Sequence, residues 1–172
     1  MLLYGYPGSG KTLFARQFAD ELQNTIHLHA DKLQHDLAEQ LHAENQHNSA
    51  LSGIIFKYLT EEYLNNGISI VLDASLTKKN ERKIFRKIAA DNKAEVVLVW
   101  LQIDADSAFA RVKKRDKRKT EDKYADEYSP SEFQSIISGC QNPENEDFVV
   151  ISGKHTFQSQ KASVHKKLYE LG

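Results

Sequence analysis

The sequence predicts a three-layer α/β domain with a mainly parallel five-stranded sheet, and three observations support this prediction. Short apolar runs of strand length alternate with longer stretches of helical periodicity along the 172 residues. The run VVLVWL at 96–101 is continuously apolar, which is typical of a strand buried on both faces of a parallel sheet. A glycine-rich loop separates the first apolar run from the first helical pattern. Helices that alternate with strands in this way pack on both faces of one sheet.

Three strands are expected in the first half of the chain, at Met1–Tyr4, Thr25–His29 and Ile68–Leu72. The helices between them are predicted from apolar residues that recur every three or four positions. Their expected apolar faces are Leu13, Phe14, Ala15, Phe18, Ala19 and Leu22, then Leu33, Leu37 and Leu41, then Leu51, Ile54, Ile55, Tyr58 and Leu59.

The ends of these helices carry their own signals. Asp31 is placed to cap the second helix, and a polar break over 44–48 should end it. The third helix should end near residues 65–67, because Asn-Asn-Gly tolerates a left-handed backbone.

The second half continues the alternation of strands and helices. A helix over 78–91 precedes the strand at 96–101, and Asp104 or Asp106 should begin the next helix. A helix over 130–138, a strand over 148–151 and a final helix complete the pattern. Trp100 lies within an apolar strand, so we expect it in the core rather than stacked on a base.

Residues 5–12, GYPGSGKT, fit the phosphate-binding pattern G-x-x-x-x-G-K-[ST]. The loop amides can surround phosphate oxygens, Lys11 can reach the β- and γ-phosphates, and the Thr12 hydroxyl is placed to bind Mg²⁺. The helix that follows would direct its free N–H groups at the same phosphates. This context predicts the P-loop NTPase fold and a nucleoside triphosphate as ligand. The residues expected to bind it are Gly5, Pro7, Gly8, Ser9, Gly10, Lys11 and Thr12.

Length and composition favour one domain spanning residues 1–172. The 23 Lys and Arg nearly balance the 24 Asp and Glu, so net charge gives no support to a nucleic-acid partner, which would need a local basic patch. Cys140 is the only cysteine, and no apolar run reaches membrane-spanning length, so we expect a cytoplasmic protein without a membrane partner. The start at Met1 leaves no room for a signal peptide, although the short first strand also fits a trimmed start. Nothing in the sequence indicates an oligomeric state.

Two aspartates follow predicted strands, where open α/β sheets bind ligands. Asp73 ends a strand as a Walker B acid does, so its carboxylate could hold Mg²⁺ or contact the acceptor. Asp31 could accept a proton from an attacking hydroxyl or orient it. Each could instead cap a helix or turn, and for Asp31 both roles could coexist.

A run of basic residues predicts a short helical lid over approximately 111–130. Arg115 is the main candidate to contact the transferred phosphoryl group, because an arginine stabilises the charge spread over it. Arg111 and Arg118 are weaker candidates for binding the nucleotide, and helical four-residue spacing would put Arg111 and Arg115 on one face. Most of the run is expected to be solvated surface.

Other functional classes receive less support. The sequence has no N-K-x-D motif and no D-x-x-G after Asp73, which argues against a GTPase switch. His27, His29 and His35 could suggest zinc, but no cysteine or H-E-x-x-H pattern accompanies them. We therefore expect these histidines to be structural.

These motifs resemble the small P-loop kinases related to the kinase domain of polynucleotide kinase and to the zeta toxins. GYPGSGKT is similar to the ATP-binding loop of that family, HAD to its acceptor-side aspartate, VLDAS to its Asp-Ala-Thr segment and ARVKKRDKR to its lid arginines. The resemblance implies that Asp31 engages the acceptor hydroxyl and that Arg115 contacts the ATP phosphates. Two positions depart from the pattern: Gln34 stands where polynucleotide kinases carry arginine, and Ser75 replaces threonine.

Together, the motifs and the resemblance predict an ATP- and Mg²⁺-dependent kinase that transfers the γ-phosphoryl group to an acceptor hydroxyl. Lys11, Asp31 and Arg115 are the predicted catalytic residues, and Thr12 and Asp73 the predicted metal ligands. The acceptor could be a polynucleotide 5′-hydroxyl or a small metabolite. An ATP-gated binding module, or a slow ATPase without a dedicated acceptor, is the alternative.

Overall fold

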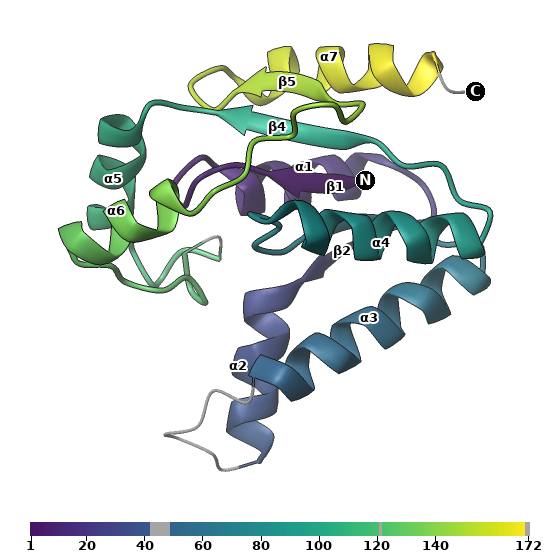
Figure 1. The fold of residues 1–172 in the computed structure, drawn as a ribbon, viewed down its shortest axis with the longest axis horizontal. Helices are drawn as coiled ribbons and strands as arrows, with labels where there is room; N and C mark the ends of the chain where they lie inside the picture. Colours follow the sequence, from purple (N-terminus) through teal and green to yellow (C-terminus); the bar gives the residue numbers. More distant parts are fainter. Residues whose placement is uncertain (42–48, 121, 171–172) are drawn as a thin grey trace.

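The computed structural model describes residues 1–41, 49–120 and 122–170. Its centre is a five-stranded parallel sheet with the strand order β2-β3-β1-β4-β5 (Figure 1). This confirms the predicted α/β architecture and the parallel sheet. The strands are β1 (Leu2–Tyr4), β2 (Thr25–His29), β3 (Ser69–Asp73), β4 (Leu98–Gln102) and β5 (Val149–Ser152).

Helices connect the strands and cover both faces of the sheet. They are α1 (Lys11–Glu21), α2 (Ala30–Gln40), α3 (Ser49–Asn65), α4 (Lys79–Asp91), α5 (Ala105–Lys113), α6 (Pro130–Ser138) and α7 (Phe157–Tyr169). Asp104 caps α5 by accepting a hydrogen bond from the Ser107 amide, as expected. Helix α6 has the predicted bounds, with a capping box between Ser129 and Glu132.

Side chains of opposite parity along the strands build two apolar layers. Leu3 faces a cluster with Phe14 and Phe18 of α1 and Val164 of α7. The neighbouring Leu2 and Tyr4 face a second cluster, which holds Phe56, Leu72, Phe85 and Ile88. Trp100 is half-buried and packs against this second cluster, with its ring centroid 5.6 Å from that of Tyr4, so it lies at the border of the core and not fully inside it.

Two local expectations differ from the structure. The residue that precedes α2 is His29, and Asp31 lies in the first turn of the helix instead of capping it. Leu13, Ile54 and Tyr58 are exposed, so helical periodicity overestimated the width of the apolar faces. The predicted polar break at 44–48 lies outside the described residues.

The segment predicted as a helical lid is helical only at its start. Helix α5 ends at Lys113, and the described residues of 114–129 form turns, a bend and stretches without regular secondary structure before α6 begins. Arg115 is therefore beyond the helix and does not share a helical face with Arg111. Helices α5 and α6 pack together through Ala108, Val112 and Phe133. Within the described ranges, no helix combines the length and the apolar character needed to cross a membrane.

Candidate functional site

A cavity of about 700 Å³ lies at the end of the sheet where the parallel strands reach their carboxyl termini. It is bordered by the loop after β1, the start of α2, the end of β3, the segment after α5 and the loop after β5. Most of the predicted site residues line it, namely Pro7, Gly8, Ser9, Gly10, Lys11, Thr12, Asp31, Asp73, Arg111 and Arg115. The fold therefore brings together residues separated by more than a hundred positions in the sequence.

The glycine-rich loop passes close to α5 at Gly8. This residue has φ of 83°, which lies in the left-handed region, and a Cβ there would be 2.3 Å from the Ala108 carbonyl oxygen. The position thus excludes any side chain both by its backbone angles and by this close approach. Helix α1 begins immediately after the loop at Lys11, so the helix N-terminus faces the cavity.

Lys11 crosses back over its own loop. Its Nζ donates hydrogen bonds to the Gly5 and Tyr6 carbonyl oxygens, at 2.8 and 3.0 Å. Burial lowers the pKa of Lys11, while Asp73 and Asp31 oppose that shift. Ser9 Oγ is fully buried and, within the described part of the chain, has no hydrogen-bond partner. A loop with an ammonium, free helix amides and such a hydroxyl fits a phosphate group.

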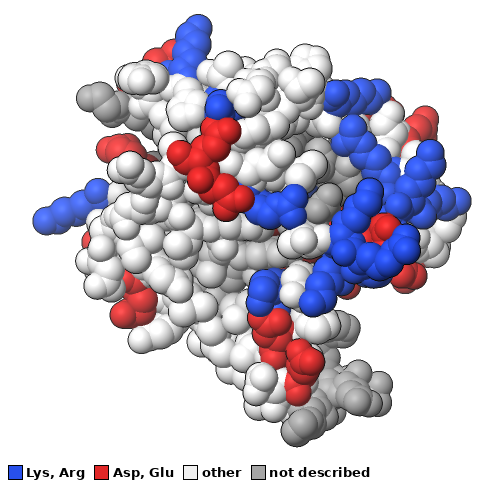
Figure 2. Space-filling view, turned by 180° about the vertical axis from the view of Figure 1, so that it is seen from behind, with Lys and Arg blue, Asp and Glu red and all other residues white. Residues whose placement is uncertain are grey.

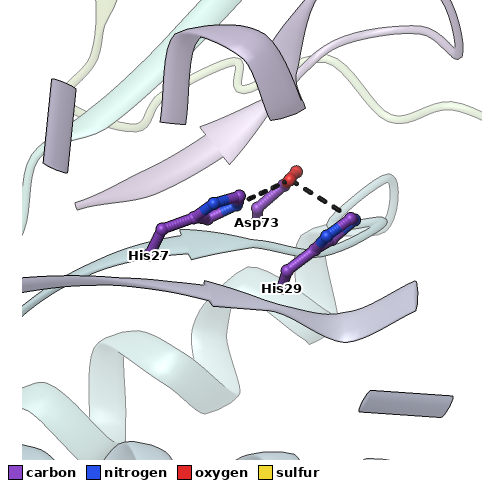
Figure 3. A group of neighbouring side chains, drawn as sticks. All are labelled: His27, His29 and Asp73. Carbon is purple, nitrogen blue, oxygen red and sulfur yellow. Dashed lines mark hydrogen bonds and ion pairs between the residues drawn. The ribbon is translucent and has the colours of Figure 1, made fainter. Parts of the chain in front are cut away.

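Asp73 ends β3 with its carboxylate against two imidazoles of the edge strand β2 (Figure 3). His27 Nε2 lies 3.0 Å from Asp73 Oδ2 and forms a hydrogen bond with it, and His29 Nε2 lies 3.7 Å from the same oxygen. Burial alone would raise the pKa of Asp73, but the His27 hydrogen bond and the charges of His29 and Lys11 lower it. The carboxylate therefore stays ionised, as a Mg²⁺ ligand must, and hard oxygen donors from Asp73 and Thr12 suit that ion.

Asp31 lies in the first turn of α2 and lines the cavity. Desolvation at the cavity wall, followed by repulsion from Asp73 and Asp126, raises the pKa of Asp31 to about 6, although 52% of its side chain is exposed. A second cavity of about 400 Å³ adjoins the first and shares Asp31, Gln34 and Asp126 with it. Tyr124 lines this second cavity. A carboxylate at the border of two cavities could face a ligand in each of them.

The basic run borders the cavity with only part of its residues. Arg111 Nη1 donates to the Gly153 carbonyl oxygen at 2.8 Å, and Arg115 Nη1 donates to the Asp126 carbonyl oxygen. Lys114 also lines the cavity, whereas Arg118 is absent from its lining among the described residues and pairs with Asp116. Basic side chains gather on the side of the molecule where α5 and the following segment lie (Figure 2).

Sequence reasoning did not single out the loop after β5. Gly153, Lys154 and His155 line the cavity, and a Cβ on Gly153 would be 2.6 Å from the Ser9 carbonyl oxygen. The signal available in the sequence was the position of this loop after the last predicted strand, since ligands bind at carboxyl ends of parallel strands. The contacts of His27 and His29 with Asp73 were also missed, because they depend on how β2 and β3 pair.

A parallel sheet whose first strand leads through a G-x-x-x-x-G-K-T loop into a helix defines the P-loop NTPase fold. A family model described as an AAA domain matches residues 1–135. The chain therefore belongs to this AAA domain family. No curated protein matches the chain significantly.

Solved structures share this fold over nearly the whole chain. A candidate kinase from Chloroflexus aurantiacus is 13% identical with a TM-score of 0.76, and the match covers 98% of this chain and 94% of that one. A gluconokinase from Sinorhizobium meliloti is 16% identical with a TM-score of 0.67, and the match covers 99% of this chain and 93% of that one. The APS kinase of Mycobacterium tuberculosis, solved with AMPPNP and APS, is 19% identical with a TM-score of 0.68. The match covers 98% of this chain and 96% of that one.

Proposed function

We propose that this chain is an ATP- and Mg²⁺-dependent kinase that transfers the γ-phosphoryl group to a hydroxyl of an acceptor. The observation that carries the proposal is the single cavity that collects Lys11, Thr12, Asp31, Asp73 and Arg115. Phosphoryl transfer needs mainly positioning and charge stabilisation, and these residues offer both. Structural neighbours named as kinases, one of them solved with AMPPNP, support ATP as the donor.

Each residue has a separate role in this reaction. Lys11 and the loop amides hold the β- and γ-phosphates, and the guanidinium of Arg115 stabilises the charge on the transferred group. Thr12 and Asp73 would hold Mg²⁺, which supplies charge neutralisation on the phosphates when bound. The acceptor oxygen forms a bond to the γ-phosphorus while the bond to the bridging oxygen breaks and ADP leaves. Asp31 takes the proton from the acceptor hydroxyl.

The class of acceptor stays open between a polynucleotide 5′-hydroxyl and a small metabolite. Gln34, in place of the arginine of polynucleotide kinases, lines both the central cavity and the smaller cavity beside it. The net charge of −1 gives no general attraction to nucleic acid. These observations favour a small hydroxylated metabolite.

Transfer of labelled γ-phosphate from Mg-ATP tests the proposal, with 5′-hydroxyl oligonucleotides and a panel of small hydroxylated metabolites as acceptors. We expect Asp31→Ala to lower acceptor labelling by about 10²-fold or more while ATP affinity stays within about threefold. Asp36→Ala is the matched control, because Asp36 lies on the same helix, pairs with Lys32 and is outside the cavity lining among the described residues.

Two results would contradict the proposed roles. If folded Asp31→Ala loses ATP binding, Asp31 belongs to the nucleotide side and not to the acceptor side. If ATP binds and phosphate is released without a labelled acceptor across the panel, the chain is a slow ATPase. Binding without release or transfer would instead identify an ATP-gated binding module.

A further inference from the structure

Two histidines of the edge strand converge on one buried carboxylate oxygen. His27 and His29 occupy alternate positions of β2, so their side chains leave the same face of the sheet. Strand pairing places His29 directly beside Asp73. The exposed fractions of the His27, His29 and Asp73 side chains are 18%, 11% and 5%, so this group lies largely out of contact with solvent.

The spacing of these three groups matches a metal coordination shell. All three ligand atoms lie within 4.8 Å of one another. The distances to Asp73 Oδ2 are 3.0 Å from His27 Nε2 and 3.7 Å from His29 Nε2. Ligands about 2.0–2.1 Å from a tetrahedral Zn²⁺ are separated by about 3.3 Å, which falls between these two distances. A hydrogen bond accounts for the His27 contact, whereas the His29 contact is too long for one.

The donor set selects the kind of ion. Imidazole nitrogens favour transition metals over Mg²⁺, which prefers oxygen ligands in octahedral geometry. Two histidines and one carboxylate are the three protein ligands of a zinc site with an open fourth position. Asp31 Oδ2 lies 3.9 Å from His29 Nε2, so a second carboxylate of this chain, which could serve as a fourth ligand, is close by.

We propose that His27, His29 and Asp73 form a binding site for Zn²⁺ or a chemically similar divalent transition metal. The site uses the face of β2 that points at the end of β3, as Figure 3 shows. It differs from the proposed Mg²⁺ position, because Mg²⁺ takes Asp73 together with Thr12 and not with the imidazoles.

One further consequence rests on the proposed function. Asp73 is a ligand in both positions, so a transition metal on the histidines draws its carboxylate away from Mg²⁺. Zn²⁺ would then inhibit phosphoryl transfer, and added Mg²⁺ would oppose that inhibition. This would make β2 a regulatory element of the kinase.

A second group of potential metal ligands, which contains one histidine, provides the matched control. His35, Asp36 and Glu39 also bring three ligand atoms within 4.8 Å, but they lie on one helix, and the exposed fractions of the His35 and Asp36 side chains are 51% and 43%. An exposed cluster on a single helix holds its ligands less rigidly than two paired strands do. His35→Gln therefore removes an imidazole without touching the proposed site.

Metal binding is measured first, on the full chain without an affinity tag and without nucleotide. Titration with Zn²⁺ against a chromophoric chelator should give one site per chain. We expect His27→Gln and His29→Gln each to weaken that site by about 100-fold, at least as much as loss of an outer partner costs. His35→Gln should leave the affinity unchanged. Unchanged Zn²⁺ affinity in both β2 variants, or loss in His35→Gln alone, would overturn the proposal.

A second measurement uses only the wild-type chain, so its result does not depend on whether the variants fold. In the wild-type chain, nitrogen-15 spectra of the histidine rings should show Zn²⁺ shifting the Nε2 resonances of His27 and His29 and leaving those of His35 in place. Shifts confined to other histidines would overturn the assignment. Inhibition of transfer is tested separately, as the ratio of activities with and without Zn²⁺ in wild type and in His29→Gln. Because binding is measured without ATP, failure of the proposed kinase activity and failure of the metal site are distinguishable.

Discussion

The two sides of the central cavity use different chemical groups. On the proposed nucleotide side, one continuous segment from Pro7 to Thr12 offers backbone amides and a lysine, and α5 packs directly on it at Gly8. On the opposite side, Asp31 and Asp73 come from different elements, and the His29 imidazole lies near both carboxylates, 3.9 and 3.7 Å away. The first side is sensitive to any added Cβ, whereas the second is sensitive to charge. Variants on each side should therefore fail in different ways.

The largest effect is expected from neutralising the acceptor side. Asp31→Asn should lower kcat by about 10²–10⁴-fold, because an amide cannot accept the proton of the acceptor hydroxyl. Nucleotide affinity should stay within about threefold. The measurement is steady-state transfer together with nucleotide titration.

The pH profile sharpens this prediction, because burial and nearby carboxylates raise the pKa of Asp31 to about 6. Below that pH the carboxyl is protonated and cannot act as a base, so kcat/KM of the wild type should rise as pH increases through about 6 and then level off. Asp31→Asn should lack this step. A wild-type profile that is flat between pH 5 and 7 would remove Asp31 from the role of base.

The next largest effect is expected from a single methyl group on the nucleotide side. Gly8→Ala places a Cβ 2.3 Å from the Ala108 carbonyl oxygen at a φ of 83°, so the loop must move away from α5. Strain of this kind costs about 2 kcal/mol, which corresponds to about 30-fold weaker nucleotide binding.

Isothermal titration with ATP and thermal unfolding measure the Gly8→Ala effect, and Gly53→Ala is the control. Gly53 lies in α3 with nothing within 4 Å of a built Cβ, so alanine there should stabilise the helix by up to about 1 kcal/mol. Wild-type ATP affinity in Gly8→Ala would mean that the loop tolerates displacement.

A smaller effect is expected at Arg111 of α5, which joins this helix to the loop after β5. Arg111 donates to the Gly153 carbonyl oxygen at 2.8 Å and so holds the loop after β5 against the cavity. Arg111→Ala should raise the KM for ATP by about tenfold through loss of a charge-assisted contact. Lys113→Ala is the control, because Lys113 is the other basic residue in the last turn of α5. Its ammonium lies 4.9 Å from the Phe109 ring centroid. Equal effects of the two substitutions would indicate a general charge effect and no specific role for Arg111.

The same contrast explains which features the sequence could predict. GYPGSGKT encodes its chemistry within eight neighbouring residues, and α6 carries its start signal in Ser129, Pro130 and Glu132, so both could be identified locally. The contact between His27 and Asp73 joins residues 46 positions apart and depends on β2 pairing with β3. The sequence pattern predicts strands but not their lateral order. The early end of α5 could not be predicted for a different reason, because a run of basic residues gives no clear stop signal.

The smallest effect is expected at Arg118, which the basic run predicted as a nucleotide contact. Its Nε and Nη2 donate to the two Asp116 carboxylate oxygens, each at 2.9 Å, and its side chain is 90% exposed. Exposed ion pairs of this kind contribute about 0–1 kcal/mol to stability. Arg118→Ala should therefore change the KM for ATP by less than about twofold, while Arg115→Ala, measured in parallel, should lower transfer substantially. An equal loss in both variants would mean that Arg118 leaves Asp116 to bind phosphate, and the nucleotide side would then extend along the whole basic run.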